Sequence, residues 1–158
     1  MRAVVQRVRR ASVSWRDEDG GERCHDIGRG VVVLVGVGPS DESADADRLA
    51  DKVLGLRIFP DDAGRFNLSL EDVRGEALVV SQFTLYADAR RGRRPSFTGA
   101  APPDHARRLC ERFADRLAAR GVPTRTGGFG ARMVVSLDNE GPVTLALSTD
   151  PWETRIHA

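Results

Sequence analysis

The segment Ser81–Thr84 places two hydroxyls, one amide and one aromatic ring directly after an apolar run. A substrate at such a strand end can meet side chains and main-chain amides together, although the same pattern is more often structural. A hydroxyl nucleophile requires a nearby base. The three histidines, His25, His105 and His157, fall in an expected hairpin, at a helix start and in the tail. A Ser-His-Asp triad is therefore not indicated.

Metal and cofactor chemistry has little support in the residue pattern. Carboxylates fall mainly in charge runs such as Asp17–Asp19, without the interleaved histidines of a metal site. Cys24 and Cys110 lie far apart and lack CxxC spacing, so we interpret both as free thiols of a reducing compartment. No phosphate loop or dinucleotide fingerprint follows an apolar run. We expect neither a metal nor a cofactor.

Two further motifs are ambiguous when each is taken alone. Gly141–Pro142 is typical of an ordinary turn, because only about 5 to 6% of X-Pro bonds in folded proteins are cis. Four arginines of an expected loop could hold an RNA backbone, although a solvated loop explains them equally well: Arg90, Arg91, Arg93 and Arg94. Because the formal net charge is +1, any nucleic-acid contact must be local.

The apolar pattern predicts the elements that must position these residues. Strands are expected over residues 3–8, 11–15, 30–37, 76–83, 132–137 and 143–147. One amphipathic helix is expected after an N-cap at Ser40. A second begins at Pro102–Pro103 and ends before Gly121. Residues 16–22 are expected to form a hairpin tip, and residues 138–142 to join the last two strands.

The length of 158 residues, 41% of them hydrophobic, suits one compact domain. The expected elements favour an α/β fold over residues 1–158, with a curved, largely antiparallel sheet or barrel, two main covering helices and a tail over 150–158. The longest apolar run, Val31–Val37, is too short to span a membrane as a helix, and the first residues lack the apolar core of a secretory signal. We expect a cytoplasmic protein without membrane association.

Taken together, Ser81–Leu85 and Asn139–Thr144 resemble the two signature motifs of the D-aminoacyl-tRNA deacylases, also called D-tyrosyl-tRNA deacylases. The resemblance covers nearly the whole chain, since it continues through residues 6–8, 56–59, 94–97 and 128–133. The charged segment Arg16–His25 and the tail from Asp150 depart from the compact pattern of that family. Both are peripheral, so the departure concerns the hairpin and the tail rather than the site.

The resemblance implies a hydrolase that cuts the ester bond between a D-amino acid and the terminal adenosine of tRNA, as chiral proofreading in translation. It implies that the achiral glycyl ester is also accepted. The catalytic wall implied by the motif consists of Ser81, Gln82, Phe83 and Thr84. Its main-chain amides would hold the substrate and polarise its carbonyl. Phe129 and Met133 would flank the terminal adenosine and the amino acid.

The resemblance also implies a homodimer with its active sites at the subunit interface. Gly141 and Pro142 of the partner subunit would complete the pocket through a cis bond and leave no room for an L side chain. Arg7 would brace this insertion through hydrogen bonds. Because Thr84 lacks an evident base, we favour a substrate-assisted reaction in which the ribose 2′-hydroxyl helps to activate water or to attack.

Two alternatives remain open from the sequence. A non-catalytic nucleic-acid-binding module on the same scaffold would use the Arg90–Arg94 loop as its contact and would hydrolyse no D-aminoacyl-tRNA. An acyl hydrolase acting through Thr84 would turn over small esters that lack the ribose of the RNA.

Overall fold

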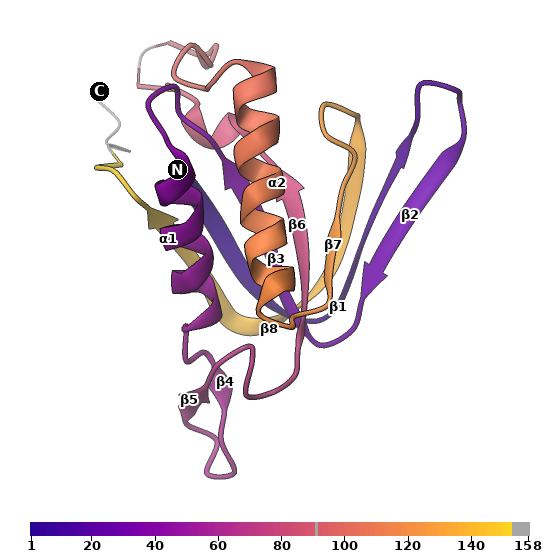
Figure 1. Ribbon diagram of the computed structural model, residues 1–158, viewed down its shortest axis with the longest axis vertical. Helices are drawn as coiled ribbons and strands as arrows, with labels where there is room; N and C mark the ends of the chain where they lie inside the picture. The colour runs from indigo at the N-terminus through magenta and orange to yellow at the C-terminus, as the bar shows by residue number, and fades with distance from the viewer. Residues whose placement is uncertain (91, 153–158) are drawn as a thin grey trace.

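The computed structural model of the protein describes residues 1–90 and 92–152. The elements are β1 (Arg2–Arg16), β2 (Glu22–Ile27), β3 (Gly30–Gly36), α1 (Ser43–Leu54), β4 (Phe59–Pro60), β5 (Phe66–Leu68), β6 (Glu76–Ser81), the 3-10 helix η1 (Phe83–Tyr86), α2 (Pro103–Ala119), β7 (Thr124–Thr126) and β8 (Met133–Ser148). The strands form a strongly curved sheet, and α1 and α2 lie side by side on one of its faces (Figure 1).

The main sheet is mixed. Its order is β2-β1-β3-β6-β7, with β8 paired to the other edge of β1. β1 runs antiparallel to β2, β3 and β8, whereas the β3–β6 and β6–β7 pairs are parallel, because a helix lies in each of these two connections. The predicted α/β fold, with two helices and a curved, largely antiparallel sheet, is confirmed, since three of the five strand pairs of the main sheet are antiparallel. His25 Nδ1 lies 2.7 Å from the Thr126 carbonyl oxygen and so brings β2 to β7, which nearly closes a barrel.

β1 and β8 are each one long strand, where the sequence predicted pairs of short ones. Gln6 pairs with Thr144 and Val8 with Asn139, so β8 advances five residues while β1 advances two. The extra residues, 140–143, form a bulge within an otherwise continuous ladder. The expectation that residues 138–142 join two separate strands was therefore wrong, because both halves of β8 pair with β1.

Three other element boundaries bear on the predictions. α1 begins at Ser43 with Glu42 as its N-cap, so the expected N-cap at Ser40 was wrong. The Glu42 main-chain amide donates to Asp45 Oδ2 at 2.8 Å, and this capping box fixes the start of the helix. The strand expected to reach Phe83 ends at Ser81, and η1 follows it. α2 confirms the second predicted helix.

Two apolar clusters hold the sheet in shape. β3 and β6 contribute to both, because successive side chains of a strand point to opposite faces. Val33 and Val79 pack toward the helices, in the cluster that contains Phe113. Val32 and Leu78 pack inside the curl of the sheet, in the second cluster. The ends of β3 and β6 are thus fixed from both sides, which gives a site at these ends a rigid floor.

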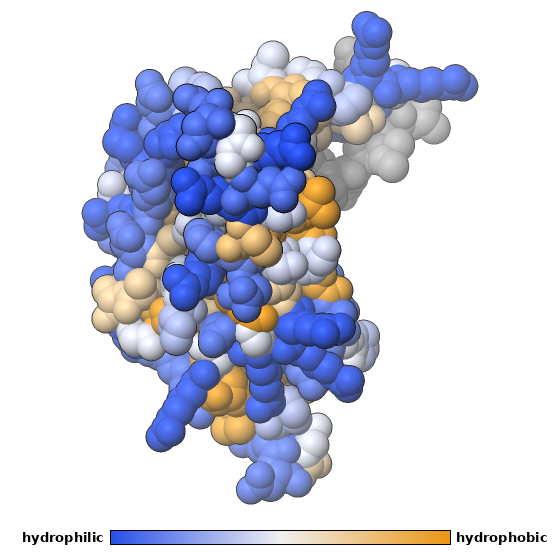
Figure 2. Space-filling model, turned by 90° about the vertical axis from the view of Figure 1, so that its right-hand side faces the viewer, coloured by the Kyte–Doolittle hydropathy of each residue, from blue (hydrophilic) through white to orange (hydrophobic). Residues whose placement is uncertain are grey.

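The surface is mainly polar on the side that Figure 2 shows, where hydrophobic side chains occur in separate patches between hydrophilic ones. Within residues 1–90 and 92–152, no helix has the length and apolar character needed to cross a membrane. Cys24 is exposed and Cys110 is buried, and both are free thiols.

Candidate active site

A cavity of about 400 Å³ opens between the ends of β3 and β6 and the N-terminal half of α2. Four residues that the sequence analysis assigned to the site line this cavity, namely Ser81, Gln82, Phe83 and Phe129. Its other walls are largely apolar and come from the end of β3, the loop before α2 and α2 itself. The cavity thus combines a polar strand end with an apolar enclosure, as a small-molecule site requires.

The strand end is shaped by the parallel pairing of β3 with β6. Ser81 is aligned with Val35, and the Gln82 main-chain amide donates to the Val35 carbonyl at 2.7 Å. The chain then turns into η1, which packs closely over Gly36. A Cβ at Gly36 would approach the Gln82 carbonyl oxygen to 2.9 Å, so glycine is needed for this close approach. The turn directs the motif into the cavity.

Thr84 lies on η1 next to the cavity, and its hydroxyl accepts a hydrogen bond from the Gln82 side-chain amide. An amide cannot act as a general base for this hydroxyl. His25 contacts the Thr126 carbonyl, and His105 Nε2 lies 2.9 Å from the Asp41 carbonyl oxygen. Neither histidine lines the cavity, and His157 lies outside the described residues. The geometry supplies Thr84 with an amide partner and no histidine base among the described residues.

Two aromatic rings form the rim of the cavity. Phe83 and Phe97 meet edge to face, with ring centroids 5.2 Å apart. Both are exposed in spite of their size. Aromatic pairs of this geometry attract each other, so the rim is an ordered apolar surface open to a ligand or a protein partner.

Phe129 separates this cavity from a second, more polar hollow of about 820 Å³. The guanidinium carbon of Arg107, on α2, lies 4.6 Å from the centre of the Phe129 ring. A cation over an aromatic face is attracted by the ring. Arg107 therefore holds Phe129 in its place between the two hollows.

Cys110 contributes a thiol to the wall of the cavity from α2. Burial, with a smaller effect of the nearby Glu111 charge, raises the pKa of this thiol to about 12. The thiolate is the nucleophilic form of cysteine. At neutral pH Cys110 is thus an apolar wall residue rather than a nucleophile.

Arg7 is buried, with 5% of its surface exposed, and connects three segments. Its Nε donates to the Glu140 carbonyl oxygen at 3.1 Å, and its Nη1 donates to the Ile58 carbonyl oxygen. Glu140 Oε2 also lies 3.3 Å from Arg7 Nε, although its orientation makes no hydrogen bond. Arg7 thereby fixes the first residue of the β8 bulge, in which the Gly141–Pro142 bond is cis.

Gly141 and Pro142 are exposed and lie at the opposite end of the sheet from the cavity of their own chain. The ladder aligns Asn139 with Val8, Val8 with Gly30, and Gly30 with Glu76, the first residue of β6. The six residues of β6 separate this row from Ser81 by about 17 Å. A chain therefore cannot place its own Gly141–Pro142 against its own Ser81.

The remaining predicted site residues lie elsewhere. Met133 packs against the apolar cluster inside the curl and does not line the cavity. Arg90 donates to both carboxylate oxygens of Asp88, while Arg93 and Arg94 are exposed. Arg91 lies outside the described residues, as does the tail beyond Trp152.

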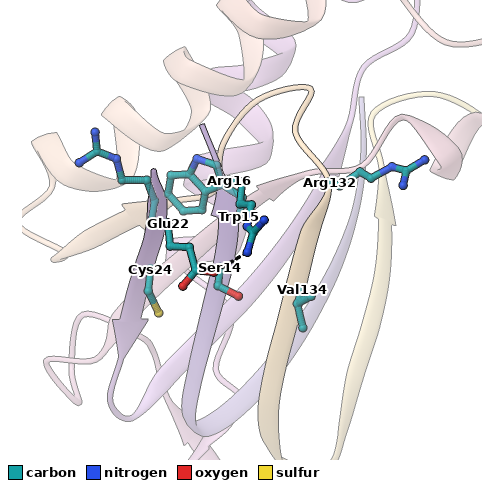
Figure 3. A pocket seen from close by; sticks show the side chains of 8 residues that line it. Ser14, Trp15, Arg16, Glu22, Cys24, Arg132 and Val134 are labelled. Carbon is teal, nitrogen blue, oxygen red and sulfur yellow. Dashed lines mark hydrogen bonds and ion pairs between the residues drawn. The ribbon is translucent and has the colours of Figure 1, made fainter. Parts of the chain in front are cut away.

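A third hollow, of about 640 Å³, lies across β2, β1 and β8. Figure 3 shows that Cys24, Ser14 and Val134 reach it from these three strands, with Arg16 paired to Glu22 at 3.0 Å. None of the site residues expected from the sequence lines this hollow. The cavity at the end of β6 is the stronger candidate because the predicted motif residues converge there.

The fold and site define a small α/β protein with a strand-end cavity in a nearly closed mixed sheet. The family model described as D-Tyr-tRNA(Tyr) deacylase matches residues 4–148. The chain therefore belongs to the D-Tyr-tRNA(Tyr) deacylase family.

Individual relatives are similar over nearly their whole length. A D-aminoacyl-tRNA deacylase of Roseiflexus sp. is 57% identical over 149 residues, which are 94% of this chain and 94% of that protein. One from Chloroflexus aurantiacus is 56% identical over 156 residues, 99% of this chain and 94% of the relative. A solved structure titled c-Myc DNA Unwinding Element Binding Protein has a TM-score of 0.85 and 38% identity, covering 96% of this chain and all of that one.

Sequence reasoning missed several residues that shape the cavity. Phe97 was noted as part of the resemblance but given no role, although it forms the rim with Phe83. Cys110 was interpreted as a free thiol, and it also forms part of the cavity wall. No sequence pattern marks Arg107 as a site residue, because its contact with Phe129 joins segments that are distant in the sequence.

Proposed function

We propose that this protein hydrolyses the ester bond of D-aminoacyl-tRNA, and also of glycyl-tRNA, releasing the free amino acid and tRNA. The observation that carries the proposal is the convergence of Ser81, Gln82, Phe83 and Phe129 on one cavity. Membership of the family and curated relatives named D-aminoacyl-tRNA deacylase support the reaction. The cytoplasm is the proposed compartment, and tRNA with its aminoacylated 3′ end is the proposed substrate.

In the proposed mechanism the protein positions the ester and the RNA supplies part of the chemistry. Main-chain amides at the end of β6 polarise the ester carbonyl, and stabilise the negative charge that develops on its oxygen. The ribose 2′-hydroxyl of the terminal adenosine helps to activate a water molecule. The water oxygen attacks the carbonyl carbon, the bond from that carbon to the ribose oxygen breaks, and the ribose oxygen takes up a proton, so that free amino acid and tRNA are released. Thr84 is not the nucleophile in this scheme, since its hydroxyl is bonded to the Gln82 amide.

A second copy of the chain completes the proposed site. The register of the sheet keeps Gly141–Pro142 remote from the cavity at the end of β6 in the same chain. These residues can therefore line such a cavity only in a partner chain. The bulge projects from an exposed part of β8, and Arg7 fixes its base. In the partner's cavity it would occupy the space that an L side chain needs. D-aminoacyl and glycyl esters would still fit.

Deacylation of charged tRNA by the purified protein tests the proposal. We expect release of D-tyrosine from D-tyrosyl-tRNA and of glycine from glycyl-tRNA, with L-tyrosyl-tRNA left intact. Binding of all three RNAs without hydrolysis would instead indicate a non-catalytic RNA-binding module. Turnover of a small ester that lacks the ribose would favour a conventional esterase.

A further inference from the structure

Phe66 is a large apolar residue at the surface, 56% exposed, and is the first residue of β5, the second strand of the small β4–β5 hairpin. A lone exposed aromatic residue is unremarkable on a protein surface. Phe66, however, contacts Arg7, the side chain that holds the base of the bulge. The guanidinium carbon of Arg7 lies 5.2 Å from the centre of the Phe66 ring.

Phe66, Arg7 and Glu140 form one cluster from three elements. Arg7 donates to Glu140 on β8 and to Ile58, which directly precedes β4. Phe66 covers this guanidinium from β5. The ring and the bulge that contains Gly141–Pro142 therefore belong to one surface.

A second exposed aromatic surface is the rim of the cavity, formed by Phe83 and Phe97. If the bulge enters a partner's cavity, Phe66 would approach the mouth of that cavity, because Phe66 contacts Arg7 at the base of the bulge. Three exposed phenylalanines of the described residues are thus distributed over the two surfaces that the cross-subunit site would bring together.

We propose that Phe66 is a docking residue that packs against the Phe83–Phe97 rim of a second copy of this chain and closes that copy's cavity over the substrate. The inference rests on the proposed function, since it requires the bulge to enter the partner's cavity. A twofold dimer makes the contact twice, once at each site. Aromatic residues packed into the centre of interfaces are frequent determinants of affinity.

The test compares Phe66→Ala with Val134→Ala in a dilution series followed by analytical ultracentrifugation. Val134 is a matched control because it is 66% exposed and lies in the hollow across β2, β1 and β8, away from the bulge. We expect Phe66→Ala to raise the dimer dissociation constant on the order of 100-fold, since both copies lose a central aromatic contact. Val134→Ala should leave the constant unchanged. Phe66→Trp, which keeps an aromatic ring, should retain most of the affinity.

Deacylation of D-tyrosyl-tRNA, measured over the same concentrations, separates docking from a purely local role. Activity of Phe66→Ala should fall on dilution and recover at high protein concentration. An unchanged dissociation constant in Phe66→Ala would overturn the inference, as would equal weakening by Val134→Ala. If the wild-type chain is a fully active monomer, the cross-subunit site itself fails. If it is a dimer that Phe66→Ala does not weaken, only the role of Phe66 fails.

Discussion

Arg7 and Glu140 are joined across the β1–β8 ladder where its register is interrupted, with Arg7 Nε donating to the Glu140 carbonyl oxygen at 3.1 Å. The same guanidinium donates to the Ile58 carbonyl. A planar guanidinium presents several donors in fixed directions, which the single ammonium of lysine does not. The base of the bulge therefore depends on arginine specifically.

Arg7→Lys should weaken both the fold and the proposed reaction. Either the buried Ile58 carbonyl or the part-buried Glu140 carbonyl would lose its donor, which costs about 1–3 kcal/mol of unfolding free energy. We also expect deacylation of D-tyrosyl-tRNA to fall more than the loss of folded protein accounts for, since the bulge would no longer be fixed. Urea unfolding and kinetics at matched folded fraction measure the two effects. The exposed Arg9, also on β1, provides the control Arg9→Lys, and an equally small effect of both variants would refute the role of Arg7.

Thr84→Ala should retain much of the deacylase activity. The Thr84 hydroxyl accepts a hydrogen bond from the Gln82 amide, and the proposed chemistry uses main-chain amides and the substrate. Single-turnover kinetics with D-tyrosyl-tRNA give the relevant rate. Loss of turnover with folding and substrate binding intact would show that the hydroxyl acts chemically.

Tyr86, the one tyrosine of the chain, should resist ionisation in alkali. Burial, and then the charge of Asp41, raise its pKa well above the ordinary 10.0. The folded state thus keeps a proton that the unfolded state loses near pH 10, so stability declines as the pH rises above that value. Tyrosinate absorbance should appear near pH 10 in urea and only at higher pH in the native protein. Coincident titrations would contradict this, and Tyr86→Phe should reduce the alkaline loss of stability.

Cys110 should be unreactive although it lines the cavity. Its pKa of about 12 leaves very little thiolate at neutral pH. Iodoacetamide should modify the exposed Cys24 and spare Cys110, whereas both should react in urea. Mass spectrometry of the labelled peptides distinguishes the two thiols. Rapid modification of Cys110 in the native protein would show that the thiol is more accessible or more acidic than its surroundings indicate.

The sequence predicted local structure well where periodicity and caps determine it, as in α2 and the buried strand β3. It failed where pairing between distant segments decides the outcome. Residues 138–142 carry the composition of a turn, yet the ladder with β1 makes them part of one strand. The motif residues of the cavity were found through the resemblance, whereas Phe97 and Arg107 became visible only through contacts in space.

In the proposed dimer, each active site combines the cavity of one chain with Gly141–Pro142 of another. Subunit mixing tests this arrangement with two variants that should each be inactive alone. Ala100→Trp fills the cavity from its wall, and Gly141→Ala adds a Cβ to the bulge, where the nearest atom it would meet, Asn139 Oδ1, is 3.1 Å away.

The two variants are dissociated, mixed in equal amounts and reassociated, and deacylation of D-tyrosyl-tRNA is measured. A mixed dimer would contain one site with both defects and one site with neither. Half of the dimers are mixed, so we expect recovery of about a quarter of wild-type activity. A mixture that exchanges subunits yet remains as inactive as its parents would show that each site is built from a single chain, and would rule out the cross-subunit site.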